Sequence, residues 1–154
     1  MDIHDVTVVG SGTMGNGIAH VFAQYGFAVT LVDIKQEFID RAIKTITANL
    51  DRQVKKGAIT DELKLQTLSR IKTSVSLEQA VSNSSIVIEA ATEDKNIKSQ
   101  IFKTLDLNAP QQTILSSNTS SISITEIAAV TKRPEKVIGM HFMNPVPLMK
   151  LVEI

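Results

Sequence analysis

The 154-residue chain has no cysteine and no tryptophan, and its 16 basic side chains balance its 16 acidic ones. The absence of cysteine excludes disulfide bridges, thiolate zinc sites and a cysteine nucleophile. Zero formal net charge argues against a nucleic-acid-binding protein, because no surplus of lysine and arginine is present to neutralise phosphates. No apolar run approaches the roughly 18 residues needed to span a bilayer, and the acidic start of the chain is unlike a signal peptide. We therefore expect a cytoplasmic protein with neither a membrane nor a nucleic acid as partner.

The residues that are present suffice for one folded domain. Hydrophobic residues make up 43% of the chain, and no repeat, low-complexity tract or flexible linker divides it. Short β-branched runs alternate with longer segments of helical spacing, a pattern typical of a parallel sheet with crossover helices. We therefore expect a single α/β domain over residues 1–154 that contains a doubly wound, mostly parallel sheet.

The same patterns give the expected elements. Strands are expected at residues 6–9, 28–32, 71–75, 86–88, 113–115, 137–140 and 148–154. Helices are expected at residues 13–25, 36–56, 94–107 and 123–130, with a further short helix capped by Thr60. Residues 36–69 would then form a helical excursion that projects from the sheet. The direction of the last strand, which follows a proline corner at residues 145–147, is left open by the sequence.

A glycine-rich motif stands where the first strand gives way to the first helix. It consists of Gly10, Ser11, Gly12, Thr13, Met14 and Gly15. Such glycines permit a tight turn, close approach of the backbone to a pyrophosphate, and close packing of the helix on the strand. Asp33 ends the second strand, where its carboxylate can accept hydrogen bonds from ribose hydroxyls. Together these residues predict a Rossmann-type fold that binds a dinucleotide. Asp33 would repel a 2′-phosphate and so favours NAD over NADP, although Lys35 nearby leaves NADP open.

Ligands of a doubly wound sheet bind beyond the carboxyl ends of its strands. Three segments follow expected strands at that edge, and we expect all three to line one cleft: residues 89–93, 116–121 and 141–145.

One of the three histidines has a place that suits catalysis. His4 lies at the start of the chain and His20 lies inside the first helix among apolar neighbours, and both are interpreted as structural. His141 ends a strand at the expected cleft, and an imidazole can take a proton from an alcohol near neutral pH. A lone histidine is commonly structural, but reversal at residues 145–147 would bring Glu153 beside the ring and orient it as a base. The alternative for Glu153 is an exposed acid near the chain end.

The serine-rich segment has two interpretations. Ser123 is placed to cap the next helix, which leaves Ser120 free to hydrogen-bond a substrate oxygen. A role in the turn itself is almost as well supported by spacing. No G-x-S-x-G elbow is present to expose a nucleophilic serine, and no ligand pair has the spacing of a zinc site. We expect no metal.

Three motifs, at residues 8–15, 117–121 and 141–153, together resemble one enzyme family. They are similar to the N-terminal NAD-binding domain of the 3-hydroxyacyl-CoA dehydrogenases, which include the bacterial 3-hydroxybutyryl-CoA dehydrogenases. The first motif is shared by many folds, whereas the other two are more specific. The resemblance covers essentially the whole chain.

The resemblance implies roles for individual residues. His141 would be the catalytic base with Glu153 as its partner, and Ser120 would hold the reacting oxygen and touch the nicotinamide end of the cofactor. Asn144 would brace the loop that follows His141. Family positions near the cofactor are matched by Glu93 and Lys98, and those that contact CoA by Asn49 and Lys56. The simpler interpretation of Lys56 is a solvated helix end. The implied reaction is the reversible, NAD-dependent oxidation of an L-3-hydroxyacyl-CoA to the 3-ketoacyl-CoA.

Family members continue into a helical domain that supplies homodimer contacts and the far wall of the acyl pocket. We therefore expect this chain to be a cofactor domain that is weakly active or inactive alone, with an exposed apolar seam that favours self-association. Two alternatives stay open. One is a related dehydrogenase of a free hydroxy or sugar acid, and the other is a non-catalytic dinucleotide-binding module.

Overall fold

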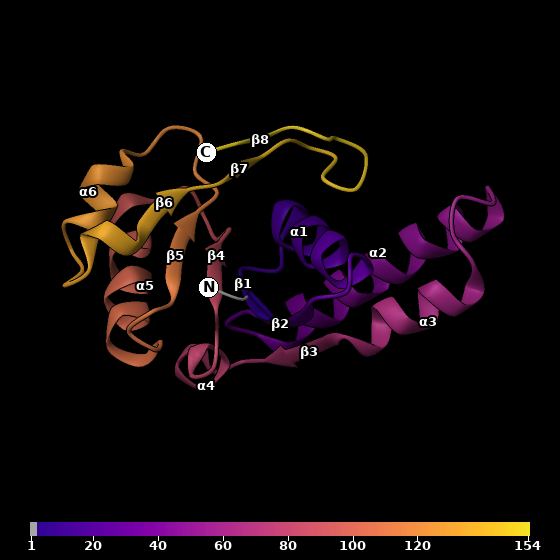
Figure 1. Cartoon of the computed structure of the whole chain (residues 1–154), viewed down its shortest axis with the longest axis horizontal. Helices are drawn as coiled ribbons and strands as arrows, with labels where there is room; N and C mark the ends of the chain where they lie inside the picture. Colours follow the sequence, from indigo (N-terminus) through magenta and orange to yellow (C-terminus); the bar gives the residue numbers. More distant parts are fainter. Residues whose placement is uncertain (1–2) are drawn as a thin grey trace.

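A six-stranded parallel sheet forms the centre of the computed structural model, which describes residues 3–154 (Figure 1). Its strands stand in the order β3-β2-β1-β4-β5-β6, and every neighbouring pair is parallel. The strands are β1 Asp5–Val9, β2 Ala28–Val32, β3 Ile71–Ser74, β4 Ile86–Glu89, β5 Ile114–Ser117 and β6 Val137–Gly139. The chain winds outward from β1 in one direction and then returns to add β4 on the other side. The predicted doubly wound α/β fold of the Rossmann type is thereby confirmed.

Helices cover both faces of the sheet. They are α1 Thr13–Gln24, α2 Gln36–Lys55, α3 Asp61–Ser69, α4 Leu77–Val81, α5 Lys95–Asn108 and α6 Ile124–Ala128, with a 3-10 turn, η1, at Pro134–Lys136. Figure 1 shows α1, α2 and α3 on one side of the sheet and α4, α5 and α6 on the other. Successive side chains of β1 point to opposite faces of the sheet. Val8 packs in the hydrophobic cluster that includes α1, and Val9 packs in the cluster that includes α5. Within residues 3–154, no helix combines the length and apolar character needed to cross a membrane.

The expected helical projection is present as α2 and α3, which extend away from the sheet (Figure 1). The buried residues of α2 recur every three or four positions and form one apolar stripe along the helix, which packs against its neighbours. They are Ile39, Ala42, Ile46 and Leu50. Thr60 caps α3 by accepting a hydrogen bond from the backbone N–H of Leu63, as its position predicted.

The end of the chain differs from the expectation. The expected strand at residues 148–154 is only the two-residue β8, Val152–Glu153, and it lies outside the main sheet. It pairs antiparallel with β7, His141–Phe142, which directly follows β6. The chain turns back between the two strands, and Val146 in this corner packs against Gly17 of α1. The Asn144–Pro145 peptide of the corner is cis. The short helix α4 was also missed, because five residues are too few to display a helical period.

Candidate active site

Three glycines shape the turn between β1 and α1. Gly10 has a φ of 94°, and a Cβ there would lie 2.6 Å from the carbonyl oxygen of Ala90. A Cβ at Gly15 would lie 1.8 Å from the carbonyl oxygen of Gly10, so both positions exclude larger residues. Gly12 immediately precedes α1, and a Cβ there would meet no atom within 4 Å. The open space at Gly12 and the N–H groups in the first turn of α1 suit a phosphate group.

The carboxylate of Asp33 is fixed against this turn. Its Oδ2 accepts hydrogen bonds from the backbone N–H and the hydroxyl of Ser11, at 2.7 and 2.6 Å. Its Oδ1 accepts one from the backbone N–H of Ile34 at 2.7 Å. The sequence did not predict this role of Ser11. Of the roughly four lone-pair sites of a carboxylate, three are used here, and the one on Oδ1 that remains can accept a hydrogen bond from a ribose.

A cavity of about 920 Å³ opens beside the turn, at the carboxyl ends of β1 and β2. Its wall includes the glycine turn, Asp33, residues 90–92 after β4, and parts of α2 and α5. Phe38 of α2 lies on this wall, with Lys35 Nζ 5.6 Å and Arg41 Cζ 4.9 Å from its ring centroid. The cavity therefore has a carboxylate and two cations near one end.

The three segments expected to line one cleft are only partly together. Residues 90–92 line the cavity, whereas residues 116–121 and 141–145 are not among its lining residues. They lie further along the sheet edge, because Glu89 of β4 pairs with Ser117 of β5 and Met140 donates to the carbonyl oxygen of Ser117 at 2.9 Å. Only the first of the three segments lines this cavity, and a cleft shared by all three stays a prediction.

His141 and Glu153 meet on the β7–β8 hairpin. They are opposite each other in the antiparallel register, and His141 Nδ1 lies 2.9 Å from Glu153 Oε2. A carboxylate only accepts hydrogen bonds, so Nδ1 is the donor of this bond, which in a neutral ring leaves the lone pair on Nε2. The predicted return of Glu153 to the imidazole is confirmed as geometry. The imidazole is half-buried and the carboxylate is exposed, with 30% and 62% of the two side chains accessible to solvent.

Two hydroxyl groups in the loop after β5 differ in whether they form hydrogen bonds within the protein. Thr119 makes the hydrogen bonds of the turn, accepting from the backbone N–H groups of Ser121 and Ile122 at 3.3 and 3.0 Å. Ser120 is exposed, and its hydroxyl has no hydrogen-bond partner within residues 3–154. The turn therefore does not use the side chain of Ser120, which leaves it available to a ligand.

Glu93 is bound to the same loop. Its Oε1 accepts hydrogen bonds from the hydroxyls of Thr119 and Ser121, the second at 3.1 Å. Partial burial raises the pKa of Glu93, but the Thr119 hydrogen bond and the charge of Lys98 outweigh it and lower the pKa overall. Glu93 is therefore a fixed anion that joins the loop after β4 to the loop after β5.

Lys98 is buried in the protein interior. Its side chain is 1% exposed, and Nζ lies 2.7 and 3.0 Å from the two carboxylate oxygens of Glu89, whose side chain is 0% exposed. Glu93 is the next carboxylate, with Oε2 at 3.6 Å. The structure therefore places Lys98 beneath residues 90–93, enclosed by protein oxygens.

The brace of the loop after His141 comes from a residue that the sequence did not single out for it. Asn118 Oδ1 accepts a hydrogen bond from the backbone N–H of Phe142 at 2.8 Å. Asn144, the expected brace, is exposed on the corner, and its role remains a prediction. Packing adds a second anchor, because Gly17 of α1 leaves room for Val146, whose Cβ would be only 2.9 Å from a Cβ at Gly17.

The comparison with known proteins agrees with this geometry. Residues 5–154 match the family model of the 3-hydroxyacyl-CoA dehydrogenase NAD binding domain. The chain belongs to the 3-hydroxyacyl-CoA dehydrogenase family. It is 49% identical to a probable 3-hydroxybutyryl-CoA dehydrogenase of Bacillus subtilis, over 100% of this chain and 53% of that protein. It thus spans about half the length of that relative.

Solved structures of the 3-hydroxyacyl-CoA dehydrogenase family superpose closely on the chain. The (S)-3-hydroxybutyryl-CoA dehydrogenase of Ralstonia eutropha has a TM-score of 0.95 at 47% identity, with 98% of this chain and 53% of that chain covered. A more distant neighbour is an NAD⁺-dependent 5-formyl-3-hydroxy-2-methylpyridine 4-carboxylic acid 5-dehydrogenase. Its TM-score is 0.86 at 30% identity, with 98% and 48% covered. The fold is therefore shared by enzymes with different substrates.

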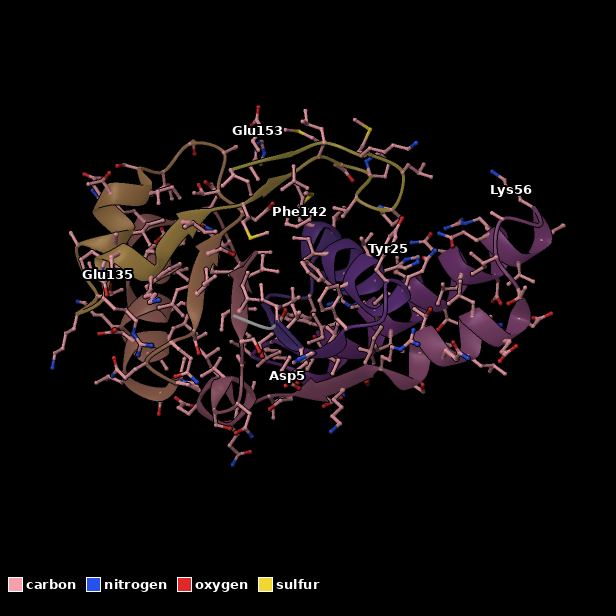
Figure 2. All side chains as sticks on the ribbon, in the orientation of Figure 1. Asp5, Tyr25, Lys56, Glu135, Phe142 and Glu153 are labelled. Atoms are coloured by element: carbon pink, nitrogen blue, oxygen red, sulfur yellow. The ribbon has the colours of Figure 1, made fainter. Side chains whose placement is uncertain are left out.

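The residues of this dehydrogenase domain fit NAD. The open space at Gly12 suits a pyrophosphate, and the fixed carboxylate of Asp33 suits an unphosphorylated adenosine ribose. Asn49 and Lys56 lie elsewhere, on α2 and just after it. Figure 2 shows Lys56 at the far tip of the helical projection, well away from Glu153 on the hairpin. The structure does not bring these two residues together with His141, and their contact with CoA remains a prediction.

Proposed function

We propose that this chain is the cofactor-binding part of an NAD-dependent dehydrogenase of L-3-hydroxyacyl-CoA, such as 3-hydroxybutyryl-CoA. The product is the 3-ketoacyl-CoA, and the reaction is reversible. The observation that carries the proposal is the 2.9 Å contact between His141 Nδ1 and Glu153 Oε2, on a hairpin that packs through Val146 on the helix following the glycine turn. An oriented imidazole next to a hydride acceptor is the equipment that alcohol oxidation requires.

Each of these side chains has a defined task in the proposed reaction. NAD supplies the hydride acceptor when it is bound. His141 Nε2 takes the proton of the C3 hydroxyl as the hydride leaves C3, and returns it during reduction. Glu153 holds the Nδ1 proton and stabilises the imidazolium that forms. The Ser120 hydroxyl donates a hydrogen bond to the reacting oxygen, and Ser120 contacts the nicotinamide end of the cofactor.

The remaining parts of the proposal concern the substrate and the whole protein. Asn49 and Lys56 would contact CoA along the helical projection. The exposed apolar side chains of the hairpin, Leu148, Leu151 and Ile154, offer a surface on which a further domain or a second subunit of a homodimer can pack. Turnover by the isolated 154 residues should accordingly be weak or absent.

Two measurements test the proposed function. The first is titration of the chain with NADH and with NADPH, where NADH should bind more tightly because Asp33 repels a 2′-phosphate. The second is NADH oxidation with acetoacetyl-CoA in the intact protein, which His141→Gln should reduce about 10²- to 10⁴-fold without loss of NADH binding. Absence of NADH binding by the wild-type chain would refute the proposal.

The distant pyridine-carboxylic-acid dehydrogenase favours one alternative, a substrate that lacks CoA. Turnover of free hydroxy acids but not of hydroxyacyl-CoA would establish it. A non-catalytic dinucleotide-binding module would bind NADH and show no reaction that depends on His141.

A further inference from the structure

The chain leaves the parallel sheet directly before the hairpin that carries His141. β6 ends at Gly139 and β7 begins at His141, so Met140 alone joins the two strands. This covalent link does not by itself orient the hairpin, because each residue keeps two soft backbone dihedrals. Contacts made just after Met140 must therefore set where β7 stands relative to the sheet.

Backbone hydrogen bonds continue the pairing of β5 with β6 only as far as Met140. Ser117 is opposite Gly139, and the N–H of Met140 donates to the carbonyl oxygen of Ser117 at 2.9 Å. In an extended chain the next N–H on the same side is that of Phe142, and a regular parallel ladder would bond it to the carbonyl oxygen of Thr119. Thr119 has already entered the loop after β5, so the ladder ends here.

The side chain of Asn118 supplies the acceptor that the ladder lacks. Its Oδ1 accepts the hydrogen bond from the N–H of Phe142 at 2.8 Å, and its own backbone N–H donates to the carbonyl oxygen of Glu89 at 2.8 Å. The backbone of Asn118 thus extends the pairing of β5 with β4. Its side-chain amide, which has the same donor and acceptor groups as a peptide, continues the pairing towards β7. One residue therefore links all three strands.

The hydrogen bond to Phe142 fixes the backbone of His141 as well. The N–H of Phe142 belongs to the planar peptide group that contains the Cα of His141, so a bond to this N–H limits rotation of the whole plane. The antiparallel register then places Glu153 opposite His141 and Val152 opposite Phe142. Asn118 therefore sets the position of the imidazole and of its carboxylate partner together, relative to β4 and β5.

We propose that Asn118 is a positioning residue for proton transfer, whose Oδ1 holds the hairpin where His141 Nε2 meets the reacting oxygen. This role rests on the proposed function, because it takes His141 as the base. It acts through the backbone of Phe142, and it requires the amide oxygen of Asn118 rather than the amide nitrogen. The rate should be sensitive to the loss of this bond, because a displacement of about 1 Å can cost about a hundredfold.

Two variants separate the amide oxygen from the amide nitrogen, and the chain offers a matched control. Asn118→Leu has a similar shape and removes the acceptor, whereas Asn118→Asp keeps an acceptor oxygen and removes the donor nitrogen. The control is Thr113→Val, because the buried hydroxyl of Thr113 donates to the carbonyl oxygen of Ser84 at 2.6 Å. That bond also joins the segments of β5 and β4, but just before the two strands begin, at the opposite edge of the sheet from the hairpin.

The experiment measures NADH oxidation with acetoacetyl-CoA by the intact protein, together with hydrogen exchange of the Phe142 amide. Asn118→Leu should lower kcat about 10- to 100-fold, with the KM for NADH within about twofold of wild type, and its Phe142 amide should exchange faster. Asn118→Asp should keep kcat within about threefold of wild type, because it retains the acceptor. Thr113→Val should lose stability but keep kcat. If Asn118→Leu does not fold, Asn118→Ala replaces it, because it removes the acceptor without adding apolar volume.

The possible results point to different conclusions. Wild-type kcat in Asn118→Leu overturns the positioning role, and so does a Phe142 amide that exchanges at the same rate in this variant and in wild type. An equal loss of kcat in Asn118→Leu and Asn118→Asp also overturns it, because the amide nitrogen would then be the group in use. An equal loss in Thr113→Val indicates a general effect of stability and overturns it too. A wild-type protein that does not oxidise NADH with acetoacetyl-CoA refutes the proposed function itself.

Discussion

Substitution of Gly12 by alanine should separate folding from cofactor binding. A Cβ at this position would meet no atom of the protein within 4 Å, and the backbone at φ −64° and ψ −166° is accessible to alanine. The unfolded chain loses conformational freedom on this change, so the free energy of unfolding should rise by about 0.4–1 kcal/mol. For a chain of this size that is an increase in Tm of roughly 1–4 °C.

The affinity for NADH should fall in Gly12→Ala, although the stability rises. The added methyl group would occupy the space that we assign to the pyrophosphate and displace it from the N–H groups of α1. Loss of one or two hydrogen bonds to a charged group, each about 1.5–3 kcal/mol, corresponds to at least a tenfold weaker NADH affinity.

Thermal unfolding and NADH titration of Gly12→Ala together check both effects. Gly15→Ala is the comparison, because its Cβ would lie 1.8 Å from the carbonyl oxygen of Gly10 and should lower both stability and binding. If Gly12→Ala binds NADH as tightly as wild type, the pyrophosphate does not lie at this turn and the reasoning is wrong.

Three further predictions concern the hairpin and a buried histidine. Glu153→Gln should lower turnover of the intact protein about tenfold or more with NADH affinity unchanged, because the imidazole loses its oriented, anionic partner. Gly17→Ala should destabilise the chain by about 1–2 kcal/mol and lower turnover, because its Cβ would lie 2.9 Å from Val146 Cβ and push away the hairpin. Burial lowers the pKa of His20 below its ordinary value of 6.5, against a weaker opposing effect of Gln24. The unfolded chain then binds a proton first, so the free energy of unfolding should fall as the pH drops below about 6.5, and His20→Met should flatten that dependence.

Each of these predictions has a contrary result. Wild-type turnover in Glu153→Gln would show that the carboxylate of Glu153 does not contribute to the reaction. A Gly17→Ala protein with wild-type turnover would show that the hairpin adapts to the added methyl group. Denaturant unfolding between pH 5 and 7 checks His20, and identical pH dependence in wild type and His20→Met would contradict the linkage.

The sequence predicted those features that depend on local pattern. The sheet and the glycine turn follow from residues that are close together in the chain, such as the run before Gly10 and the helix after Gly15. The meeting of His141 with Glu153 was expected on condition of a chain reversal, because the prolines between them interrupt the strand and permit one, and the antiparallel register of β7 and β8 shows that reversal.

Other features depend on contacts that leave no pattern in the sequence. Glu89 reads as the polar end of an apolar strand, and the family resemblance placed Lys98 near the cofactor without a protein partner. Only the packing of α5 on β4 joins the two side chains. Asn118 binds the backbone of Phe142, and a backbone donor carries no side-chain signal. The extent of the cavity was likewise not predictable, because it depends on how α2 and α5 lean over the sheet edge.

The hairpin that carries His141 and Glu153 is separate from the sheet that shapes the dinucleotide cavity. The proposed proton-transfer pair and the proposed cofactor site consequently lie on different sheets, which are joined through Asn118, Val146 and the chain at Met140. Substrate preference can thus diverge by reshaping the hairpin and whatever covers it, while the nucleotide cradle stays constant.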